Sequence, residues 1–167
     1  PEKADTAKAI AQIILSRRLD QLSRAANTKV LGGQAINDEL FGLGSSFGAL
    51  MVVKDGDWQN ALSATEQQLR SAAAHGFTKS EVEEAIALLA NAYRNAASQV
   101  NSRQSVQLAE QLSVAAHKKT IVQNPADTLA MFEGFVPDLT VDVVNAAFRE
   151  AWGTGANTIH ITTKTPL

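Results

Sequence analysis

The spacing of apolar residues predicts a long first helix followed by two extended segments. Apolar side chains recur at helical spacing between about Asp5 and Ala25, and form one broad face made of Ile10, Ile13, Ile14, Leu15, Leu19 and Leu22. The helical period is lost between Thr28 and Asp55, where five glycines occur. We therefore expect two strands there, one over 28–36 and one over 46–54.

The second of these strands has apolar residues on both of its faces. Alternation places one set of side chains together, namely Phe47, Ala49, Met51 and Val53. The opposite face carries Leu50 and Val52. Because a strand buried on both faces reads as a continuous apolar run, we expect this strand to be covered on both sides.

A helix predicted over 57–75, with Asp57 as its cap, ends at a junction where the next helix begins at once. Gly76 can adopt the left-handed conformation that ends a helix. Thr78 can cap the next helix while Glu81, three residues later, bonds back to it, which is the pattern of a capping box. Phe77 and Val82 have the spacing of a hydrophobic staple.

The remaining sequence predicts more helices and one last strand. Helices are expected over 80–100 and 103–118, then from Pro125 after an Asn124 cap, and finally from the Leu139-Thr140 pair to a glycine at 153. Residues 156–163 alternate, which predicts a strand with Ile159 and Ile161 on one face. This order of elements predicts an α+β fold, with an antiparallel sheet of three or four strands covered by helices.

Composition narrows the classes of partner. The chain has 167 residues, 45% hydrophobic and 19% charged, which suits a single packed domain. Its net charge of -2 gives no basic surface for nucleic acid or an anionic membrane. No apolar run approaches the roughly 20 residues of a membrane span. The chain has no cysteine, which is compatible with bacterial periplasm or cytoplasm alike.

The sequence gives no candidate for catalysis or metal binding. The three histidines, His75, His117 and His160, match no zinc-ligand spacing, and His-x-x-Glu-His does not occur. We interpret each histidine as structural and expect neither a catalytic residue nor a cofactor in this chain.

One segment supports a binding role, namely Val30-Leu31-Gly32-Gly33-Gln34. Two glycines in a strand allow another backbone to come close, since no Cβ intervenes. If this strand lies at a sheet edge, an extended peptide could add to it through main-chain hydrogen bonds. The alternative is a β-bulge that bends the strand for packing, and the sequence leaves both interpretations open.

The order of several segments resembles a family. These are Ser16-Arg17-Arg18-Leu19 in the first helix, the glycine-rich strand pair, Gly76-Phe77-Thr78 with Glu81, and Leu139-Thr140 with Asp142-Val143. Together they resemble a non-catalytic domain of the insulinase/pitrilysin zinc metallopeptidases, and specifically the unit that follows the zinc-bearing one. Members of this family are built from repeated α/β units, of the kind also found in the mitochondrial processing peptidase, which form a hollow clamp around a peptide.

This resemblance has several implications. Residues 1–167 would be a single α+β domain and a fragment of a longer, zinc-dependent peptidase, with zinc held in the preceding domain. Its partners would be peptide substrates and the other domains of the same polypeptide. The segment Val30–Gln34 matches one that anchors the end of the substrate peptide. Since the metal-binding histidines and the catalytic glutamate of the family have no counterpart here, the chain alone should be inactive.

Two other functions stay open at this point. The chain could be a structural or assembly subunit of the same fold, as the respiratory-complex core proteins of this family are, with no substrate. It could also be an unrelated α/β domain that binds a small ligand. A His-x-x-Glu-His segment elsewhere in the polypeptide would favour the peptidase, whereas a pocket enclosed within the chain would favour the small-ligand domain.

Overall fold

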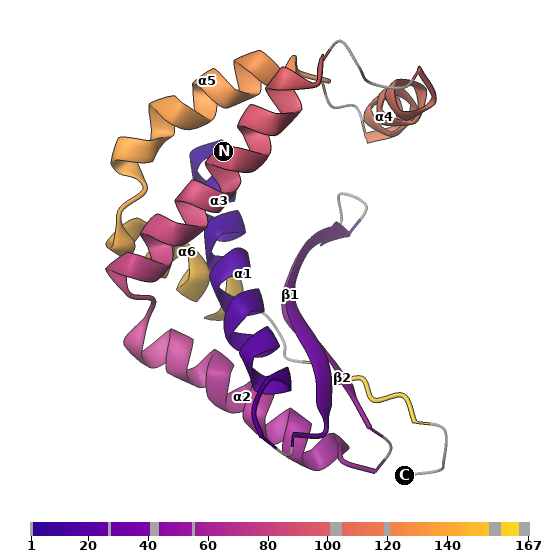
Figure 1. Cartoon of the computed structure of the whole chain (residues 1–167), viewed down its shortest axis with the longest axis vertical. Helices are drawn as coiled ribbons and strands as arrows, with labels where there is room; N and C mark the ends of the chain where they lie inside the picture. Colours follow the sequence, from indigo (N-terminus) through magenta and orange to yellow (C-terminus); the bar gives the residue numbers. More distant parts are fainter. Residues whose placement is uncertain are drawn as a thin grey trace. The chain divides into compact units, whose positions relative to one another are not determined.

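The structure is a computed structural model that describes residues 2–26, 28–40, 44–54, 56–100, 105–118, 121–153 and 158–163. These residues form six α-helices, one short 3-10 helix and two strands (Figure 1). In chain order they are α1 (Glu2–Ser23), β1 (Val30–Leu40), β2 (Gly44–Val53), α2 (Trp58–His75), α3 (Lys79–Ser98), α4 (Ser105–Lys118), α5 (Pro125–Phe135), η2 (Val136–Asp138) and α6 (Val141–Gly153). The predicted α+β class is confirmed.

The chain divides into two compact units. The first comprises residues 1–82 and 140–167, and so contains α1, both strands, α2 and α6. The second comprises residues 83–139, with most of α3 followed by α4, α5 and η2. All the residues singled out for binding, and the junction at Gly76, belong to the first unit.

Strands β1 and β2 form an antiparallel hairpin with one irregularity. Gly33 pairs with Met51, and Ala35 pairs with Ala49. Between Val30 and Gly32 the register shifts, which leaves Leu31 as an extra residue. An extra residue in one strand is the definition of a β-bulge, so a bulge, one of the two interpretations that the sequence left open, is present beside Gly32.

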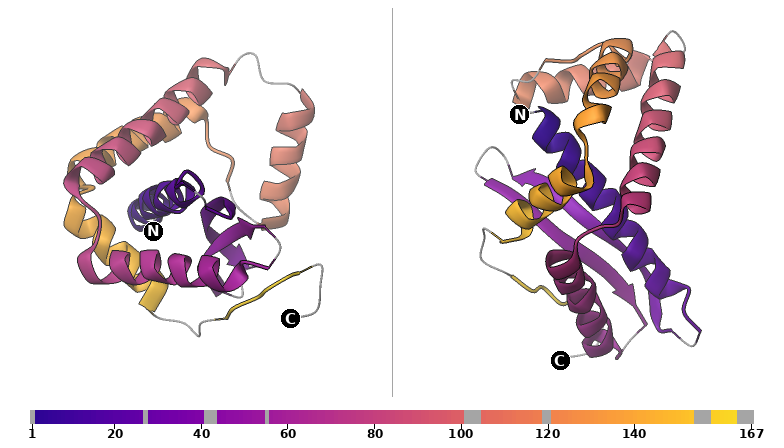
Figure 2. Two further views of the ribbon diagram at one scale, coloured as in Figure 1. Left: turned by 60° about the horizontal axis from the view of Figure 1, so that its bottom comes forward. Right: turned by 90° about the vertical axis from the view of Figure 1, so that its left-hand side faces the viewer.

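The core of the first unit lies where three helices contact the hairpin (Figure 2). Helix α1 packs along β1 and buries Ile10, Ile14, Leu15 and Leu19 completely or almost so. Helix α6 contributes Phe148, whose ring meets Phe47 of β2 edge-on at a centroid distance of 5.6 Å. The same ring meets Phe77 at 5.3 Å. The face of β2 that carries Phe47, Ala49, Met51 and Val53 is therefore the one turned to the helices, and these residues are half-buried.

The opposite face of β2 corrects one prediction. Leu50 is 48% exposed and Val52 is 52% exposed, so this face is not covered by the part of the chain that the structure describes. Alternation shows that both faces are apolar, but it cannot show whether a second layer is present to cover the outer one. The hairpin consequently presents an apolar outer face.

The last predicted strand is not formed. Residues 158–163 have no regular secondary structure, residues 156 and 157 lie outside the described ranges, and Ile159 is 65% exposed. The described sheet therefore has two strands instead of three or four. Alternating polarity is only one requirement of a strand, because the main chain must also pair with a neighbouring edge.

Most helix starts follow the predicted capping chemistry. Asn124 accepts the Ala126 N–H through its side chain at 3.1 Å, and Thr140 Oγ1 accepts the Val143 N–H at 3.3 Å. Asp57 precedes α2 but makes no side-chain cap. Its Oδ1 accepts a hydrogen bond from the Asn60 side chain instead, so the predicted cap is wrong in this detail.

The two neighbouring glycines of β1 face opposite sides of the hairpin. A Cβ placed on Gly33 would overlap the sulfur of Met51 and lie 3.1 Å from Leu19 Cβ of α1. A Cβ placed on Gly32 would have no atom within 4 Å. Gly33 therefore lets α1 come close to the sheet, whereas a side chain at Gly32 would project from the exposed face.

The same substitution at these two glycines should have opposite effects on stability. Gly33→Val should lower the free energy of unfolding by about 1–3 kcal/mol, because its side chain overpacks the contact with α1. Gly32→Val should leave it unchanged or raise it slightly, since a β-branched residue suits an exposed strand position. Urea unfolding of both variants measures this difference, and an equal loss would show that the orientation of the glycines is wrong.

Candidate functional site

The predicted peptide-binding segment forms the start of β1. Strand β2 pairs with it along one side, and no other described strand pairs with its far side. Within the segment Val30 is buried, whereas Leu31 is 57% exposed. The segment therefore lies at an edge of the described sheet, as the binding interpretation requires.

Helix α1 closes this edge at Ala35. The Ala35 N–H donates to Ser16 Oγ at 2.9 Å, and the Ala35 carbonyl accepts from Gln12 Nε2 at 3.1 Å. Since the N–H and the C=O of Ala35 both bond to side chains of α1, both point away from β2. Ser16 and Gln12 thus take the place that a neighbouring strand would have at this residue.

The edge is open two residues earlier. Main-chain groups along an antiparallel strand alternate between its two edges, so those of Gly33 point to the same edge as those of Ala35. In the described part of the chain, no side chain bonds to Gly33. The N–H and C=O of Gly33 are therefore placed to pair with an added strand.

The outer face beside this opening is apolar at the residues of β2 that lie opposite it. Gly32 lies directly opposite Val52, and Gln34 lies opposite Leu50. Val52 and Leu50 are each about half exposed, at 52% and 48%. Within the paired register, the ionisable side chain on this face is Asp38, opposite Ser46, and the exposed Lys54 follows directly after β2. The opening thus combines unpaired main-chain groups with an apolar surface.

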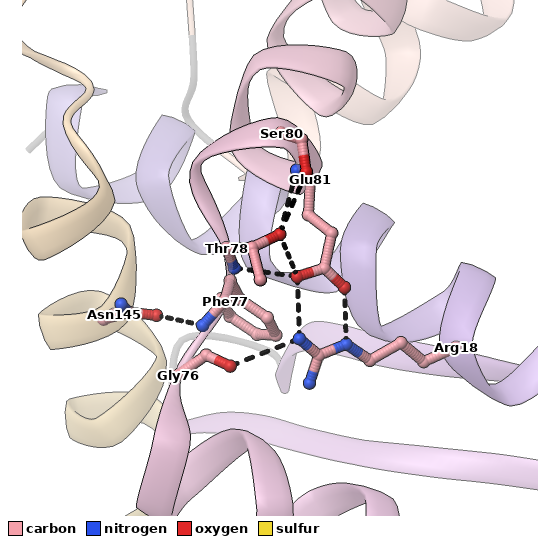
Figure 3. A network of polar contacts seen from close by, with 7 residues as sticks. All are labelled: Arg18, Gly76, Phe77, Thr78, Ser80, Glu81 and Asn145. Carbon is pink, nitrogen blue, oxygen red and sulfur yellow. Dashed lines mark hydrogen bonds and ion pairs between the residues drawn. The ribbon is translucent and has the colours of Figure 1, made fainter.

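A network of charged and polar groups joins the elements behind the hairpin (Figure 3). Arg18 of α1 binds the Glu81 carboxylate with two hydrogen bonds, from Nε at 2.7 Å and from Nη2 at 2.8 Å. Its Nη2 also donates to the Gly76 carbonyl at 3.2 Å. The guanidinium lies over the Phe77 ring, 5.0 Å from the centroid. One side chain of α1 therefore holds the whole helix junction.

The predicted capping box is confirmed within this network. The Thr78 N–H donates to Glu81 Oε2 at 2.8 Å, and the Glu81 N–H donates to Thr78 Oγ1 at 3.3 Å. Hydrogen bonds from Arg18 lower the pKa of Glu81 from 4.5 to about 2, against the opposing effect of burial and with further help from Thr78. The carboxylate is fully engaged in holding α1 to the start of α3.

Asn145 of α6 completes the network, and sequence reasoning missed it. Its Oδ1 accepts the Phe77 N–H at 2.7 Å. Gly76 has φ +74°, and a Cβ there would lie only 2.6 Å from the Asn145 side chain. The available signal was a polar residue on the apolar side of α6, one position after Val144. Such a residue must be hydrogen-bonded when it is buried.

The residues of this network are suited to structure and not to chemistry. Among the described residues, no group of three or more His, Cys, Asp or Glu could hold a metal ion. The Glu81 carboxylate, the Thr78 hydroxyl and the Phe77 N–H each bond to another protein group. Two of the four segments behind the family resemblance meet here, because Arg18 bonds to Gly76 and Glu81.

Two further observations concern the alternative functions. An open depression of about 320 Å³ lies in the second unit, lined by Gln111, Val114, Ala115, Ile121, Val122, Gln123 and Thr128. It is a shallow surface feature, unlike the enclosed pocket expected of a small-ligand domain. No helix in the described ranges has the length and apolar character needed to cross a membrane.

Comparison with solved structures shows what this fold is. Neither a family model nor a curated protein sequence matches the chain. The crystal structure of the first half of the periplasmic protease PqqL from Escherichia coli matches with a TM-score of 0.77 and 18% identity. The chain has the fold of a part of PqqL. The match covers 89% of this chain and 32% of that one.

The complete PqqL structure gives the same result. Its TM-score is 0.75 at 18% identity, and the match covers 88% of this chain and 16% of PqqL. At this identity the similarity concerns the fold alone. The chain spans about a third of the first half of PqqL and about a sixth of the whole protease, so the activity of PqqL does not transfer to it directly.

Glu81 should make the stability of the chain depend on pH in acid. Since its folded pKa of about 2 lies below the ordinary 4.5, the carboxylate stabilises the folded state above pH 4.5, and this contribution is lost as the pH falls toward 2. Glu81→Gln should cost about 1–2 kcal/mol at pH 7. It should also flatten the decline in stability between pH 4.5 and 2.

A matched control is Glu66→Gln, which breaks an exposed ion pair with Arg70 on α2. Urea unfolding across the acid range should give the same curve for this variant as for the unsubstituted chain. If Glu81→Gln also leaves the curve unchanged, the junction does not depend on this carboxylate.

Proposed function

We propose that this chain is a non-catalytic, substrate-enclosing domain of a longer zinc-dependent peptidase of the insulinase/pitrilysin type. In this proposal it is the unit that follows the zinc-bearing one. The observation that carries the proposal is the shared fold with part of the protease PqqL, at a TM-score of 0.77 over 89% of the chain. The order of the sequence segments described above supports the choice of family.

The site supports a role in binding and not in hydrolysis. Zinc belongs to the preceding domain of the proposed enzyme, and its chemistry there would be the activation of water for attack on the peptide bond. The residues described in this chain offer no metal site. Its partners are peptide substrates and the other domains of the polypeptide.

We propose that the segment Val30–Gln34 binds the substrate as an added strand. The open main-chain groups of Gly33 would pair with an extended peptide, and such pairing gives affinity with little dependence on sequence. The bonds from Ser16 and Gln12 to Ala35 would stop the pairing there. A peptide docked in this way is held at one point while the rest of it stays available to the catalytic domain.

The test is to alter the docking strand in the full-length enzyme and to compare long with short substrates. Gly32→Val places a branched side chain beside the open edge without disturbing any atom within 4 Å. We expect about a tenfold loss of kcat/KM for long peptides that reach this domain, corresponding to about 1.4 kcal/mol of binding. Short peptides that reach only the metal should be cleaved as before.

Gly48→Val is the matched control, since Gly48 lies on the same hairpin and also has open space at its Cβ. It should affect neither class of substrate. An equal loss for both classes in Gly32→Val would indicate a folding defect, and no loss for either would reduce the segment to a structural bulge. The second result would favour the assembly-subunit alternative.

A further inference from the structure

The open part of the β1 edge is short and consists of the N–H and C=O of Gly33; this open part is the window. Helix α1 occupies both main-chain groups of Ala35, so a strand that adds to β1 must pair at Gly33 or displace Ser16 and Gln12. The displacement would leave polar groups of α1 without their partners, which costs free energy. The window therefore fixes the register of the added strand, and with it the side of the sheet that each side chain of the added strand faces.

Side chains of the added strand have room on one face only. A residue beside Gly33 would direct its side chain to the inner face, where Leu19 of α1 already lies close to the strand. A residue beside Gly32 would direct its side chain to the outer face, where no atom lies within 4 Å of the missing Cβ. The outer position beside Gly32 is thus the one that accepts a large side chain.

The surroundings of this position favour an apolar side chain. Val52 lies directly across Gly32 and is 52% exposed. Since neighbouring strands lie about 4.8 Å apart, only a long or aromatic side chain reaches Val52 across the glycine. Aromatic side chains that lie over a strand glycine stabilise sheets for this reason. A charged side chain packed against Val52 would lose hydration there without gaining an apolar contact.

We propose that this domain selects extended peptides that carry one large apolar residue, and that this residue packs over Gly32 against Val52. The inference rests on the proposed function and names its substrate class. Main-chain pairing at Gly33 supplies general affinity, while the glycine and Val52 together recognise one aliphatic or aromatic side chain. Peptides with an acidic or small residue at that position bind less tightly.

The test uses fluorescein-labelled, unstructured peptides of Ser and Thr with one guest residue. Phe, Leu, Ala and Asp are placed in turn at the guest position, and binding to the 167-residue chain is measured by fluorescence anisotropy. We expect Phe and Leu peptides to bind about tenfold more tightly than Ala and Asp peptides, since burial of a large apolar side chain contributes about 1.4 kcal/mol or more.

Variants on the hairpin locate the preference. Gly32→Val fills the space and should bring the ratio of Phe to Ala affinity close to one, while Gly48→Val should leave it unchanged. Val52→Asp gives an independent test at an exposed side chain, and should weaken the Phe peptide without strengthening the Asp peptide. Circular dichroism establishes that each variant is folded.

The outcomes separate this inference from the proposed function. If every peptide binds equally and Gly32→Val weakens all of them, the docking strand is correct and the selection for an apolar residue is overturned. If the preference persists in Gly32→Val, the apolar residue packs elsewhere and the inference is again overturned. If no peptide binds the unsubstituted chain, both the inference and the proposed binding role are overturned.

Discussion

The close approach of α1 to β1 at Gly33 is the constraint on which the first unit depends. With a side chain at this position, the end of the Met51 side chain would have to move and Leu19 of α1 would have to give way slightly. The short distance lets Ser16 and Gln12 reach the main chain of Ala35. One missing Cβ thus determines both the packing of the helix and the part of the strand edge that stays open.

The same helix fixes the opposite side of the unit through Arg18. Its bonds to Glu81 and to the Gly76 carbonyl hold the junction of α2 and α3 against α1. Asn145 holds the same junction from α6, by accepting the Phe77 N–H. These groups bond to one another, whereas the edge proposed for binding lies on the hairpin.

The features that the sequence predicted are those encoded within a few neighbouring residues. The capping box of Thr78 and Glu81 and the Asn124 cap each depend on local spacing, and both are present. The contacts that close the β1 edge could not be predicted, because Ser16 and Ala35 are joined by the tertiary fold and by no pattern along the chain. The strand predicted at residues 158–163 was wrong for a related reason, since alternation does not supply the neighbouring strand with which the main chain must pair.

The sequence also singled out the segment proposed for binding, Val30–Gln34, without showing which part of its edge helix α1 covers. Two glycines suggested close backbone approach, and in the structure Gly33 gives that approach to α1 while Gly32 stays open. Which of the two glycines is covered by α1 and which is left open depends on the face of the hairpin against which α1 packs. A sheet edge that is open at one residue and closed two residues later suits a domain that holds an extended chain in one register.

Amide hydrogen exchange tests this arrangement most directly. In the free chain the Ala35 amide, which is bonded to Ser16, should exchange slowly, and the Gly33 amide should exchange quickly. Addition of an extended peptide with a large apolar residue should slow exchange at Gly33 and leave Ala35 unchanged. A Gly33 amide that is already protected in the free chain, or one that the peptide does not slow, would contradict the account.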